Sequence, residues 1–249
     1  MKTILITGAS SGIGLACAKT LAHGNRLILC SRNLAKLKDI KLKINNNKNV
    51  YVFKVDVTSQ TQVSKMFESI RHQNIYPDVL INSAGLSLGL EKLEDGCIKD
   101  WEQMIDTNIK GLLIVSKSVL NSMKRMDNGH IINIGSIAGI VSYSKGIVYS
   151  ATKAAVKSIS DGLRKEVVEN KIKITNIQPG LVETNFSNIR FYGDAEKAKN
   201  VYKGINPLSG DDIADIIKYV INLPKHVQIN EVTVTPLHQA TVEIIHRKL

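Results

Sequence analysis

A tyrosine and a lysine stand four residues apart in the stretch Tyr149-Ser150-Ala151-Thr152-Lys153. On a helix this spacing places the two side chains on the same face. A phenol has a pKa of about 10 and is a poor base at neutral pH. A nearby ammonium group stabilises the phenolate and lowers that pKa, so the pair can act as an acid and base on a substrate hydroxyl. The spacing alone is weak evidence for such an acid and base, because tyrosine and lysine also meet on solvated helix faces.

Two further polar residues lie upstream of this pair. Ser136 follows an apolar run, thirteen residues before Tyr149, and its hydroxyl can polarise a carbonyl oxygen that is held near the phenol. Asn108 falls within a long stretch of helical spacing. An amide side chain in that setting competes with the backbone for hydrogen bonds and needs a specific reason. Together the four residues predict a site that exchanges a proton with an alcohol or carbonyl oxygen.

A glycine-rich loop near the start of the chain indicates a bound dinucleotide. The stretch T-G-A-S-S-G-I-G-L, from Thr7 to Leu15, follows an apolar run and opens an amphipathic segment. Glycine lets the backbone turn tightly and approach a pyrophosphate, and a helix N-terminus offers free N–H groups to an anion. This is the context that a dinucleotide site requires. The predicted cofactor contacts in the loop are Gly8, Ser10, Ser11, Gly12, Ile13 and Gly14.

The end of the second apolar run indicates which dinucleotide binds. A cofactor with free ribose hydroxyls usually meets a carboxylate at this place, but the stretch C-S-R-N, from Cys30 to Asn33, contains no acid. The planar guanidinium of Arg32 suits a 2′-phosphate. We therefore predict NADP rather than NAD as the cofactor, with Arg32 and Asn33 in contact with it. The alternative is that Arg32 faces solvent or caps the next helix.

The loop spacing T-G-x-x-x-G-x-G resembles the cofactor loop of the short-chain dehydrogenase/reductase family. The order and spacing of Asn108, Ser136, Tyr149 and Lys153 match the catalytic tetrad of that family. The resemblance implies that Tyr149 exchanges the hydroxyl proton and that Lys153 lowers its pKa and binds the nicotinamide ribose. It also implies that Ser136 orients the substrate oxygen, and that Asn108 helps to hold a water that relays protons to Lys153.

The same resemblance implies further cofactor contacts. An Asp after the third strand contacts the adenine ring in the family, and Asp56 stands at that place, although it is also a candidate N-cap. The stretch N-S-A-G, ending at Gly85, resembles the family's N-N-A-G, with Ser83 in place of the second Asn. The stretch P-G-L-V-E-T, ending at Thr184, matches the segment that packs on the nicotinamide. The implied contacts are Asp56, Val57, Asn82, Ala84, Gly85, Pro179, Gly180, Val182 and Thr184, besides Tyr149 and Lys153.

A closer resemblance, carried by stretches such as W-E-Q-M-I-D-T-N and G-L-V-E-T-N-F-S, is to the NADP-dependent 3-hydroxy acid dehydrogenases. Those enzymes also oxidise serine and reduce malonic semialdehyde, and they are typically homotetramers. A carboxylate substrate needs a cation or convergent donors. Arg190, in a predicted lid segment near residues 185–205, is our candidate, beside Ser136 and Tyr149 as substrate contacts. An Arg190 that faces solvent is the alternative.

Short apolar runs that alternate with longer amphipathic stretches must position these residues. Such alternation predicts an α/β fold with a parallel sheet of about seven strands, doubly wound in the Rossmann manner, as a single domain over residues 1–249. Ligands bind outside the carboxyl ends of such strands. The predicted strands are Thr3–Thr7, Arg26–Cys30, Val50–Val55, Val79–Asn82, His130–Gly135, Lys173–Gln178 and Glu231–Thr235. Predicted helices include Gly14–His23, Val63–Arg71, Asp100–Met126 and Val148–Asn170, and an Asn-rich loop spans Asn45–Asn49.

Composition narrows the classes of function. With 43% hydrophobic and 22% charged residues, the chain is typical of a globular protein. Its apolar runs are too short for a membrane span or a signal peptide, so we expect a cytoplasmic protein. The three cysteines and six histidines form no C-x-x-C or H-E-x-x-H pattern, which argues against a metal site. The net charge of +11 comes from scattered Lys and Arg residues, which argues against a nucleic-acid partner.

Two other functions remain open. The first is another reductase of the same family, such as a 3-ketoacyl reductase, for which the net charge of +11 suits an acidic carrier protein. The second is a dinucleotide-sensing protein that keeps the fold without catalysis. Sensors of this kind usually lose the Tyr or the Lys of the tetrad, whereas this chain keeps both Tyr149 and Lys153.

Overall fold

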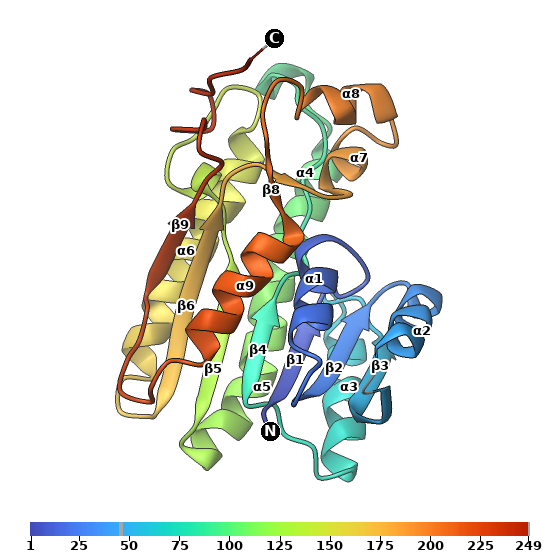
Figure 1. Cartoon of the computed structure of the whole chain (residues 1–249), viewed down its shortest axis with the longest axis vertical. Coiled ribbons are helices and arrows are strands. Elements are labelled where there is room, and N and C mark those ends of the chain that lie inside the picture. Colours follow the sequence, from blue (N-terminus) through green and yellow to red (C-terminus); the bar gives the residue numbers. More distant parts are fainter. Residues whose placement is uncertain (45–46, 249) are drawn as a thin grey trace.

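The computed structural model describes residues 1–44 and 47–248. In this part of the chain, seven parallel strands form one twisted sheet in the order β3-β2-β1-β4-β5-β6-β9 (Figure 1). The order reverses between β1 and β4, which is where a doubly wound sheet opens a crevice for a ligand. The strands are β1 Thr3–Thr7, β2 Arg26–Ser31, β3 Val50–Lys54, β4 Val79–Asn82, β5 Gly129–Ile134, β6 Ile172–Pro179 and β9 Glu231–Val234.

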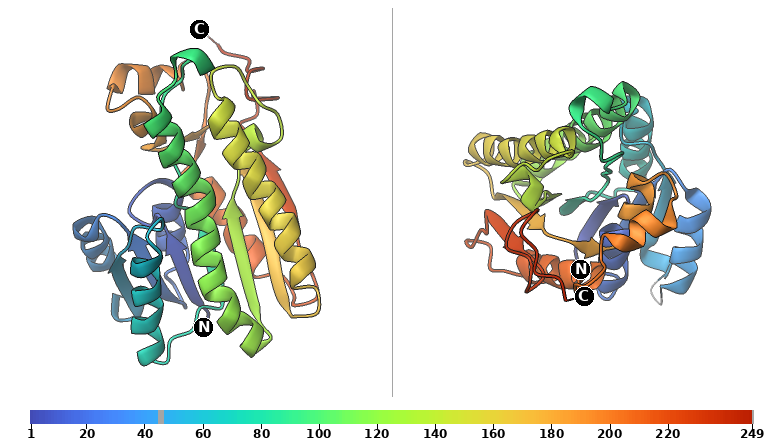
Figure 2. Two further views of the ribbon diagram at one scale, coloured as in Figure 1. Left: turned by 180° about the vertical axis from the view of Figure 1, so that it is seen from behind. Right: turned by 90° about the horizontal axis from the view of Figure 1, so that it is seen from above.

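Each strand is apolar on both sides because both faces of the sheet are covered by helices. In β1, Ile4 and Ile6 join the core on one face, whereas Leu5 joins the core on the other face, as expected of side chains that alternate along a strand. The first face is covered by α1 Gly12–Thr20, α2 Leu34–Lys43 and α9 Gly210–Ile221. The opposite face is covered by α3 Gln60–His72, α5 Leu112–Met126 and α6 Ile147–Glu166 (Figure 2).

The continuous helix predicted over Asp100–Met126 is wrong in one respect. Helix α4 (Ile98–Ile105) and helix α5 are joined by a π-helical turn over Asp106–Gly111. A π-turn contains one residue more than an α-turn and therefore rotates the side chains that follow it. The sequence period does not reveal this turn, in which Asn108 contacts a distant loop, described below.

The other predicted elements lie close to the observed ones. The predicted strands end within one residue of those observed, while α6 stops four residues before the predicted Asn170. Of the predicted Asn-rich loop over residues 45–49, positions 45 and 46 lie outside the described residues, and Asn47–Asn49 form a 3-10 turn. No helix in the described ranges is long and apolar enough to span a membrane.

Above the carboxyl ends of the strands lie two late segments of the chain. The lid segment carries α7 (Phe186–Arg190) and α8 (Ala195–Asn200), and it is flanked by the short paired strands β7 (Val182–Glu183) and β8 (Leu208–Ser209). The tail segment, residues 236–248, runs beside it. Arg247 donates hydrogen bonds to the carbonyl groups of Val201 and Lys203, at 3.1 and 2.6 Å, which join the two segments.

Candidate active site

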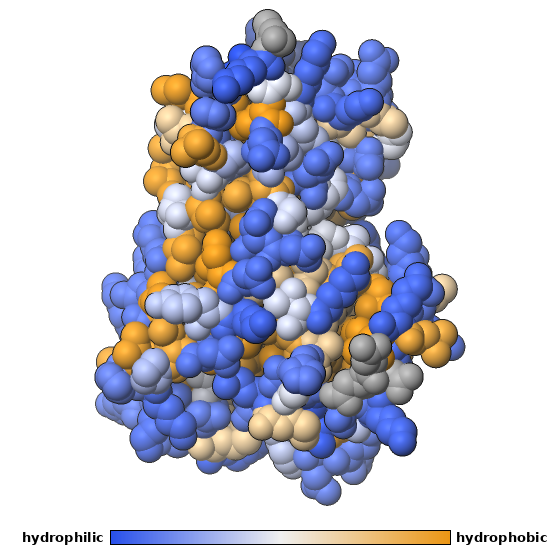
Figure 3. All heavy atoms as spheres, viewed as in Figure 1, coloured by the Kyte–Doolittle hydropathy of each residue, from blue (hydrophilic) through white to orange (hydrophobic). Residues whose placement is uncertain are grey.

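A cavity of about 820 Å³ lies at the carboxyl ends of the strands. Its walls come from the loops that follow β1 to β6, together with the lid segment and the tail segment. In Figure 3 the outline of the molecule indents between the part that carries α7 and α8 and the part that carries α1 and α2. The cavity therefore stands where the strand order predicts a ligand.

The glycine loop forms one end of this cavity. Gly8 adopts a positive φ of 66°, and a Cβ there would lie 2.9 Å from the Cα of Ala84, so no larger residue fits. Helix α1 begins at Gly12, and Ser11 at its N-cap makes no side-chain capping hydrogen bond within the described chain. The first N–H groups of α1 are thus left for an anion. Gly14 does not line the cavity; a Cβ there would lie 2.6 Å from the carbonyl oxygen of Gly8, so this glycine serves close packing.

Positive side chains lie beyond the glycine loop. Arg32, Asn33 and Lys36 are exposed and line the cavity at the end of β2. The side chain of Asn33 also caps α2 by accepting a hydrogen bond of 3.0 Å from the backbone N–H of Lys36. Lys36 was not predicted from the sequence; it lies in the first turn of α2, directly after the segment that carries Arg32 and Asn33. This end of the cavity suits a phosphate group.

The loop after β3 contributes Asp56 and Val57 to the wall of the cavity. Oδ1 of Asp56 accepts hydrogen bonds from the N–H and the hydroxyl of Thr58, at 3.0 and 2.8 Å. Ser59, rather than Asp56, is the N-cap of α3. Asp56 therefore shapes its own loop and also lines the cavity.

Tyr149 and Lys153 project from the first turns of α6, and both line the cavity. Lys153 is 6% exposed, and its Nζ donates a hydrogen bond of 2.8 Å to the carbonyl oxygen of Ile134, at the end of β5. The same Nζ lies 5.8 Å from the centre of the Tyr149 ring. Burial lowers the pKa of Lys153 to about 8, because the buried site disfavours the charged form.

The electrostatic surroundings of Tyr149 differ from those the sequence predicted. Burial raises the pKa of Tyr149 to about 12, and the charge that opposes this rise belongs to Arg190 rather than to Lys153. A hydrogen bond from Ser136 also lowers that pKa. The ammonium of Lys153 is instead turned toward the carbonyl group of Ile134. Ser136 follows β5 by two residues and lines the cavity, and its Oγ accepts a hydrogen bond of 3.1 Å from the N–H of Ala138.

Asn108 lies behind the cavity wall and does not line it. It is 2% exposed and sits in the π-turn. Its Oδ1 accepts from the N–H of Leu86 at 2.9 Å, while its Nδ2 donates to the carbonyl oxygen of Leu86 at 2.8 Å and to Oγ1 of Thr152 at 3.0 Å. A Cβ on Gly85 would lie 3.3 Å from Asn108 Oδ1 and 3.6 Å from Lys153 Nζ. Asn108 therefore fixes the loop after β4 beside Lys153.

Asn82 was predicted to contact the cofactor, and its side chain does not line the cavity. Its Nδ2 donates hydrogen bonds to Oγ of Ser116 and Oδ1 of Asn133, both at 2.9 Å, and Asn133 donates to Ser160 at 2.9 Å. This buried network joins β4 and β5 to α5 and α6 beneath the site. A side chain at the last position of a strand can point into a helix layer as well as into a ligand site, so spacing alone did not separate the two cases.

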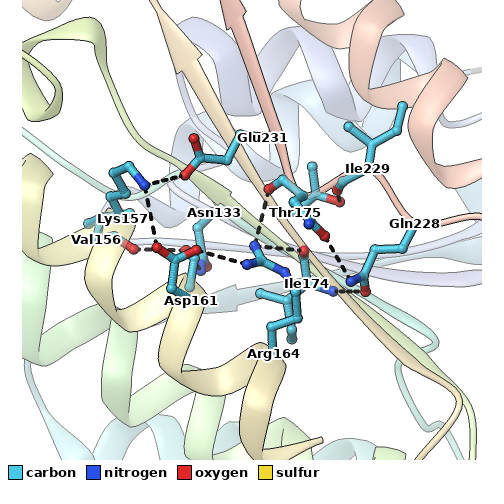
Figure 4. A network of polar contacts seen from close by, with 12 residues as sticks. Asn133, Val156, Lys157, Asp161, Arg164, Ile174, Thr175, Gln228, Ile229 and Glu231 are labelled. Atoms are coloured by element: carbon cyan, nitrogen blue, oxygen red, sulfur yellow. Dashed lines mark hydrogen bonds and ion pairs between the residues drawn. The ribbon is translucent and has the colours of Figure 1, made fainter. Parts of the chain in front are cut away.

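A second polar network fixes the outer side of α6 (Figure 4). Lys157 forms ion pairs with Asp161 at 3.3 Å and with Glu231 of β9 at 2.8 Å. Arg164 pairs with Asp161 at 2.8 Å and donates to the carbonyl oxygen of Asn230 at 3.3 Å. These contacts fasten α6 to the edge of the sheet, and they thereby help to hold the helix that carries the tyrosine and the lysine.

The other end of the cavity is mainly apolar, with one guanidinium beside the phenol. Arg190, at the end of α7, donates hydrogen bonds to Oγ of Ser87 from Nε at 3.1 Å and from Nη2 at 2.9 Å, and it also donates to the hydroxyl of Tyr143. Tyr143 and Ser87 were not predicted from the sequence, because they come from two loops far apart in the chain. The apolar lining here is formed by Leu86, Leu90, Phe186, Ile189, Phe191, Val242 and Ile245.

This combination of glycine loop, buried lysine and cavity-facing tyrosine has counterparts among known proteins. A family model described as short chain dehydrogenase matches residues 2–191. The chain belongs to the short-chain dehydrogenase family. The family indicated by the sequence motifs is therefore confirmed.

This short-chain dehydrogenase resembles individual relatives over nearly its whole length. It is 41% identical to the NADP-dependent 3-hydroxy acid dehydrogenase of Schizosaccharomyces pombe, over 99% of this chain and 97% of that protein. It is 37% identical to an NADP-dependent 3-hydroxy acid dehydrogenase of Escherichia coli K12, over 98% and 99% of the two chains. Its structure matches the closed form of serine dehydrogenase complexed with NADP+ with a TM-score of 0.94, at 37% identity, over 99% and 100% of the two chains. The predicted Rossmann-type fold is thereby confirmed.

The structure of this short-chain dehydrogenase brings most of the predicted site residues to one cavity. Three of them, Gly14, Asn82 and Asn108, lie behind its wall. The predicted residues that line it are Gly8, Ser10, Ser11, Gly12, Ile13, Arg32, Asn33, Asp56, Val57, Ala84, Gly85, Ser136, Tyr149, Lys153, Pro179, Gly180, Val182, Thr184 and Arg190.

Proposed function

We propose that this chain is an NADP-dependent oxidoreductase that transfers a hydride between the nicotinamide and a small 3-hydroxy acid. Serine is a second substrate of this class, and reduction of a malonic semialdehyde-type carbonyl is the reverse reaction. One observation carries the proposal: the phenol of Tyr149 shares one cavity with the guanidinium of Arg190 at one end and with the glycine loop and Arg32 at the other. The names of the relatives support the same substrate class.

The residues present fit NADP. The free N-terminus of α1 and the close packing at Gly8 suit a pyrophosphate. The exposed side chains of Arg32 and Lys36 suit a 2′-phosphate. Thr184 offers a hydroxyl beside Gly12, because a Cβ on Gly12 would lie 3.6 Å from Thr184 Oγ1. When bound, the cofactor supplies the acceptor or donor of the hydride.

The protein residues supply proton transfer and orientation. In the oxidation direction, Tyr149 accepts the proton of the substrate hydroxyl, and in the reduction direction it donates a proton to the forming alkoxide. Ser136 donates a hydrogen bond that orients the same oxygen. Lys153 binds the nicotinamide ribose. Because the side chain of Asn108 is committed to Leu86 and Thr152, its part in a water relay to Lys153 falls to its main chain in the π-turn.

Arg190 is the proposed anchor for the substrate carboxylate. A carboxylate and a guanidinium form strong charge-assisted hydrogen bonds, and Arg190 has five N–H donors, of which Nε and Nη2 reach Ser87 and Tyr143. The surrounding apolar side chains exclude water and strengthen such a pair. They also favour a hydroxy acid with a short alkyl group.

Further proposals concern the domain, the compartment, the assembly and the partners of the protein. We propose one dinucleotide-binding and catalytic domain over residues 1–249, with residues 185–205 as its lid segment. We propose a cytoplasmic homotetramer without a nucleic-acid or membrane partner. Light scattering on the purified protein should give four times the mass of one chain, and a monomer would contradict the proposed assembly.

The proposed function is tested by the formation of NADPH, followed through its absorbance. The panel contains L-serine, 3-hydroxypropionate, 3-hydroxybutyrate and a neutral secondary alcohol, each with NADP and with NAD. We expect activity on the hydroxy acids with NADP, and a strong preference for NADP over NAD. Activity confined to the neutral alcohol would contradict the carboxylate anchor. Faster turnover of a carrier-linked 3-ketoacyl substrate would favour a ketoacyl reductase, and no activity with any pair would favour a dinucleotide sensor.

A further inference from the structure

Arg190 occupies an aromatic cage that includes the ring of the catalytic tyrosine. Its guanidinium carbon lies 5.4 Å from the ring centre of Tyr149, 5.5 Å from that of Phe186 and 5.9 Å from that of Tyr143. The hydrogen bonds to Ser87 and to the Tyr143 hydroxyl fix the guanidinium in this place. A cation over an aromatic face is attracted by the electrons of the ring. Arg190 is therefore a neighbour of the phenol itself as well as of the substrate space.

Tyr149 has other charged and titratable neighbours besides Arg190. On its own helix, Lys153 turns its ammonium toward the carbonyl oxygen of Ile134. From the loop before α6, the Tyr143 hydroxyl accepts from Arg190. A second, small hollow that Tyr149 also lines contains the charged residues Glu91, Lys92 and Lys145, of which Lys145 lines the main cavity too. The tail segment brings Glu243 and Arg247 to the wall of the main cavity.

We propose that Arg190 is a positioning residue that stabilises the Tyr149 phenolate, and that a substrate carboxylate docked on Arg190 weakens this stabilisation. The carboxylate neutralises the guanidinium at the moment when the hydroxyl group of the substrate meets the phenol. Tyr149 then holds its proton more firmly in complexes with acidic substrates than in complexes with neutral ones. This inference rests on the proposed carboxylate anchor and adds a coupling between binding and proton transfer.

The direction of the coupling follows from the charges. The positive charge of Arg190 lowers the pKa of Tyr149 against the rise that burial causes. Adding a negative charge at Arg190 removes most of this effect, so the pKa of Tyr149 rises in the ternary complex. Acidic substrates then keep Tyr149 as a proton donor, which favours reduction near neutral pH. Oxidation of the same acids requires a more alkaline solution.

The coupling is measured by comparing two kinetic profiles against pH. The profile of kcat/KM reports groups of the enzyme before the substrate binds, whereas the profile of kcat reports groups in the ternary complex. For oxidation of 3-hydroxybutyrate with NADP, we expect kcat to rise with pH about one pH unit higher than kcat/KM does. A shift of this size is expected when the charge of Arg190, a few ångströms from the phenol, is neutralised. For the neutral amide of the same compound, the two rises should coincide.

Two substitutions of the same residue separate the charge from the contact. In Arg190→Gln, the rise of kcat/KM should move up by about one pH unit for both substrates, and the difference between the acid and the amide should vanish. Arg190→Lys keeps the charge and should retain part of that difference. Arg247→Gln removes another guanidinium from the wall of the cavity, at a position that contacts Val201 and Lys203, and should leave the positions of both rises unchanged.

The outcomes distinguish the anchor from the coupling. If Arg190→Gln raises KM for the acid alone and also moves the profiles, both proposals stand. If it raises KM for the acid while the profiles stay in place, the coupling is overturned and the anchor stands. If KM for the acid is unchanged, the carboxylate anchor is overturned. The part of the coupling that depends on the substrate carboxylate is then overturned as well.

Discussion

Replacement of Asn108 by Ala tests whether this residue braces the site from behind. The wild-type side chain is 2% exposed and makes three hydrogen bonds, two with the backbone of Leu86 and one with Thr152. Asn108→Ala removes all three without touching the wall of the cavity. The Thr152 hydroxyl keeps a partner, because it donates to the carbonyl oxygen of Tyr149 at 2.7 Å. The Leu86 N–H and C=O lose the partners that the side chain gave them.

The magnitude follows from those two groups. A buried polar group that is left without a partner costs about 1–3 kcal/mol, so two of them lower the free energy of unfolding by about 2–6 kcal/mol. That is a large part of the 5–15 kcal/mol that is typical of a whole protein. The matched control is Thr152→Val, which keeps the Leu86 contacts of Asn108 and should cost about 1 kcal/mol. Because Leu86 lines the cavity, the Ala variant should also lose activity.

Urea unfolding followed by circular dichroism measures both changes, with kcat and KM determined on the folded fraction. The reasoning would be refuted by an Asn108→Ala protein that unfolds within about 0.5 kcal/mol of the wild type, since a surface substitution has an effect of that size. An equal loss of unfolding free energy in Asn108→Ala and Thr152→Val would also refute the reasoning. That outcome would mean that the bond to Thr152, rather than the bonds to Leu86, carries the stabilisation.

Three shorter predictions concern charge. Arg32→Ala and Lys36→Ala should each raise KM for NADP about tenfold, which is about 1.4 kcal/mol for one exposed cation–phosphate contact, and leave KM for NAD within about twofold; equal losses with both cofactors would contradict a 2′-phosphate site. Burial lowers the pKa of Lys153 to about 8 from 10.5, so the unfolded chain binds more protons between these values and stability rises with pH across them. Lys153→Met should therefore be more stable than the wild type at pH 7, by up to about 3 kcal/mol in urea unfolding, and lose this advantage by pH 10.5. Burial likewise lowers the pKa of His130 to about 3 from 6.5, so acidification through this range should destabilise the wild type by about 1.4 kcal/mol per unit, and His130→Gln should flatten that dependence in acid unfolding.

The fold was predictable because its strands are buried on both faces. A strand such as β4, with the sequence V-L-I-N, reads as a continuous apolar run, and its bounds in the structure are those that were predicted. Helix ends carry weaker signals, and α6 therefore ends before the predicted Asn170. The π-turn was not evident from the sequence period, and Asn108 within it contacts Leu86, twenty-two positions away in the chain.

The cofactor end of the site was more predictable than the substrate end. Each element of the cofactor end follows a strand directly, so its position in sequence fixes its position in space. Asn82 also follows this rule, but whether its side chain enters the cavity or the core depends on neighbours such as Ser116 and Asn133. At the substrate end, Arg190 meets Ser87 and Tyr143, which lie 103 and 47 residues away. No local pattern brings these three together.

The catalytic residues and the lid segment are held in place by different contacts, which matters for the choice of substrate. The catalytic residues stand on a sheet and helix that buried networks hold in place, through Asn82, Asn133 and Ser160. The lid segment meets the loop after β4 through separate contacts, such as the hydrogen bond from Gly89 N–H to the carbonyl oxygen of Arg190 at 3.0 Å. Changes in the lid segment can therefore alter which carboxylate or alkyl group fits while the phenol stays in place. Yet Arg190 belongs to the lid segment and also touches Tyr149, so the residue that selects an acid is also the one through which that selection reaches the proton transfer.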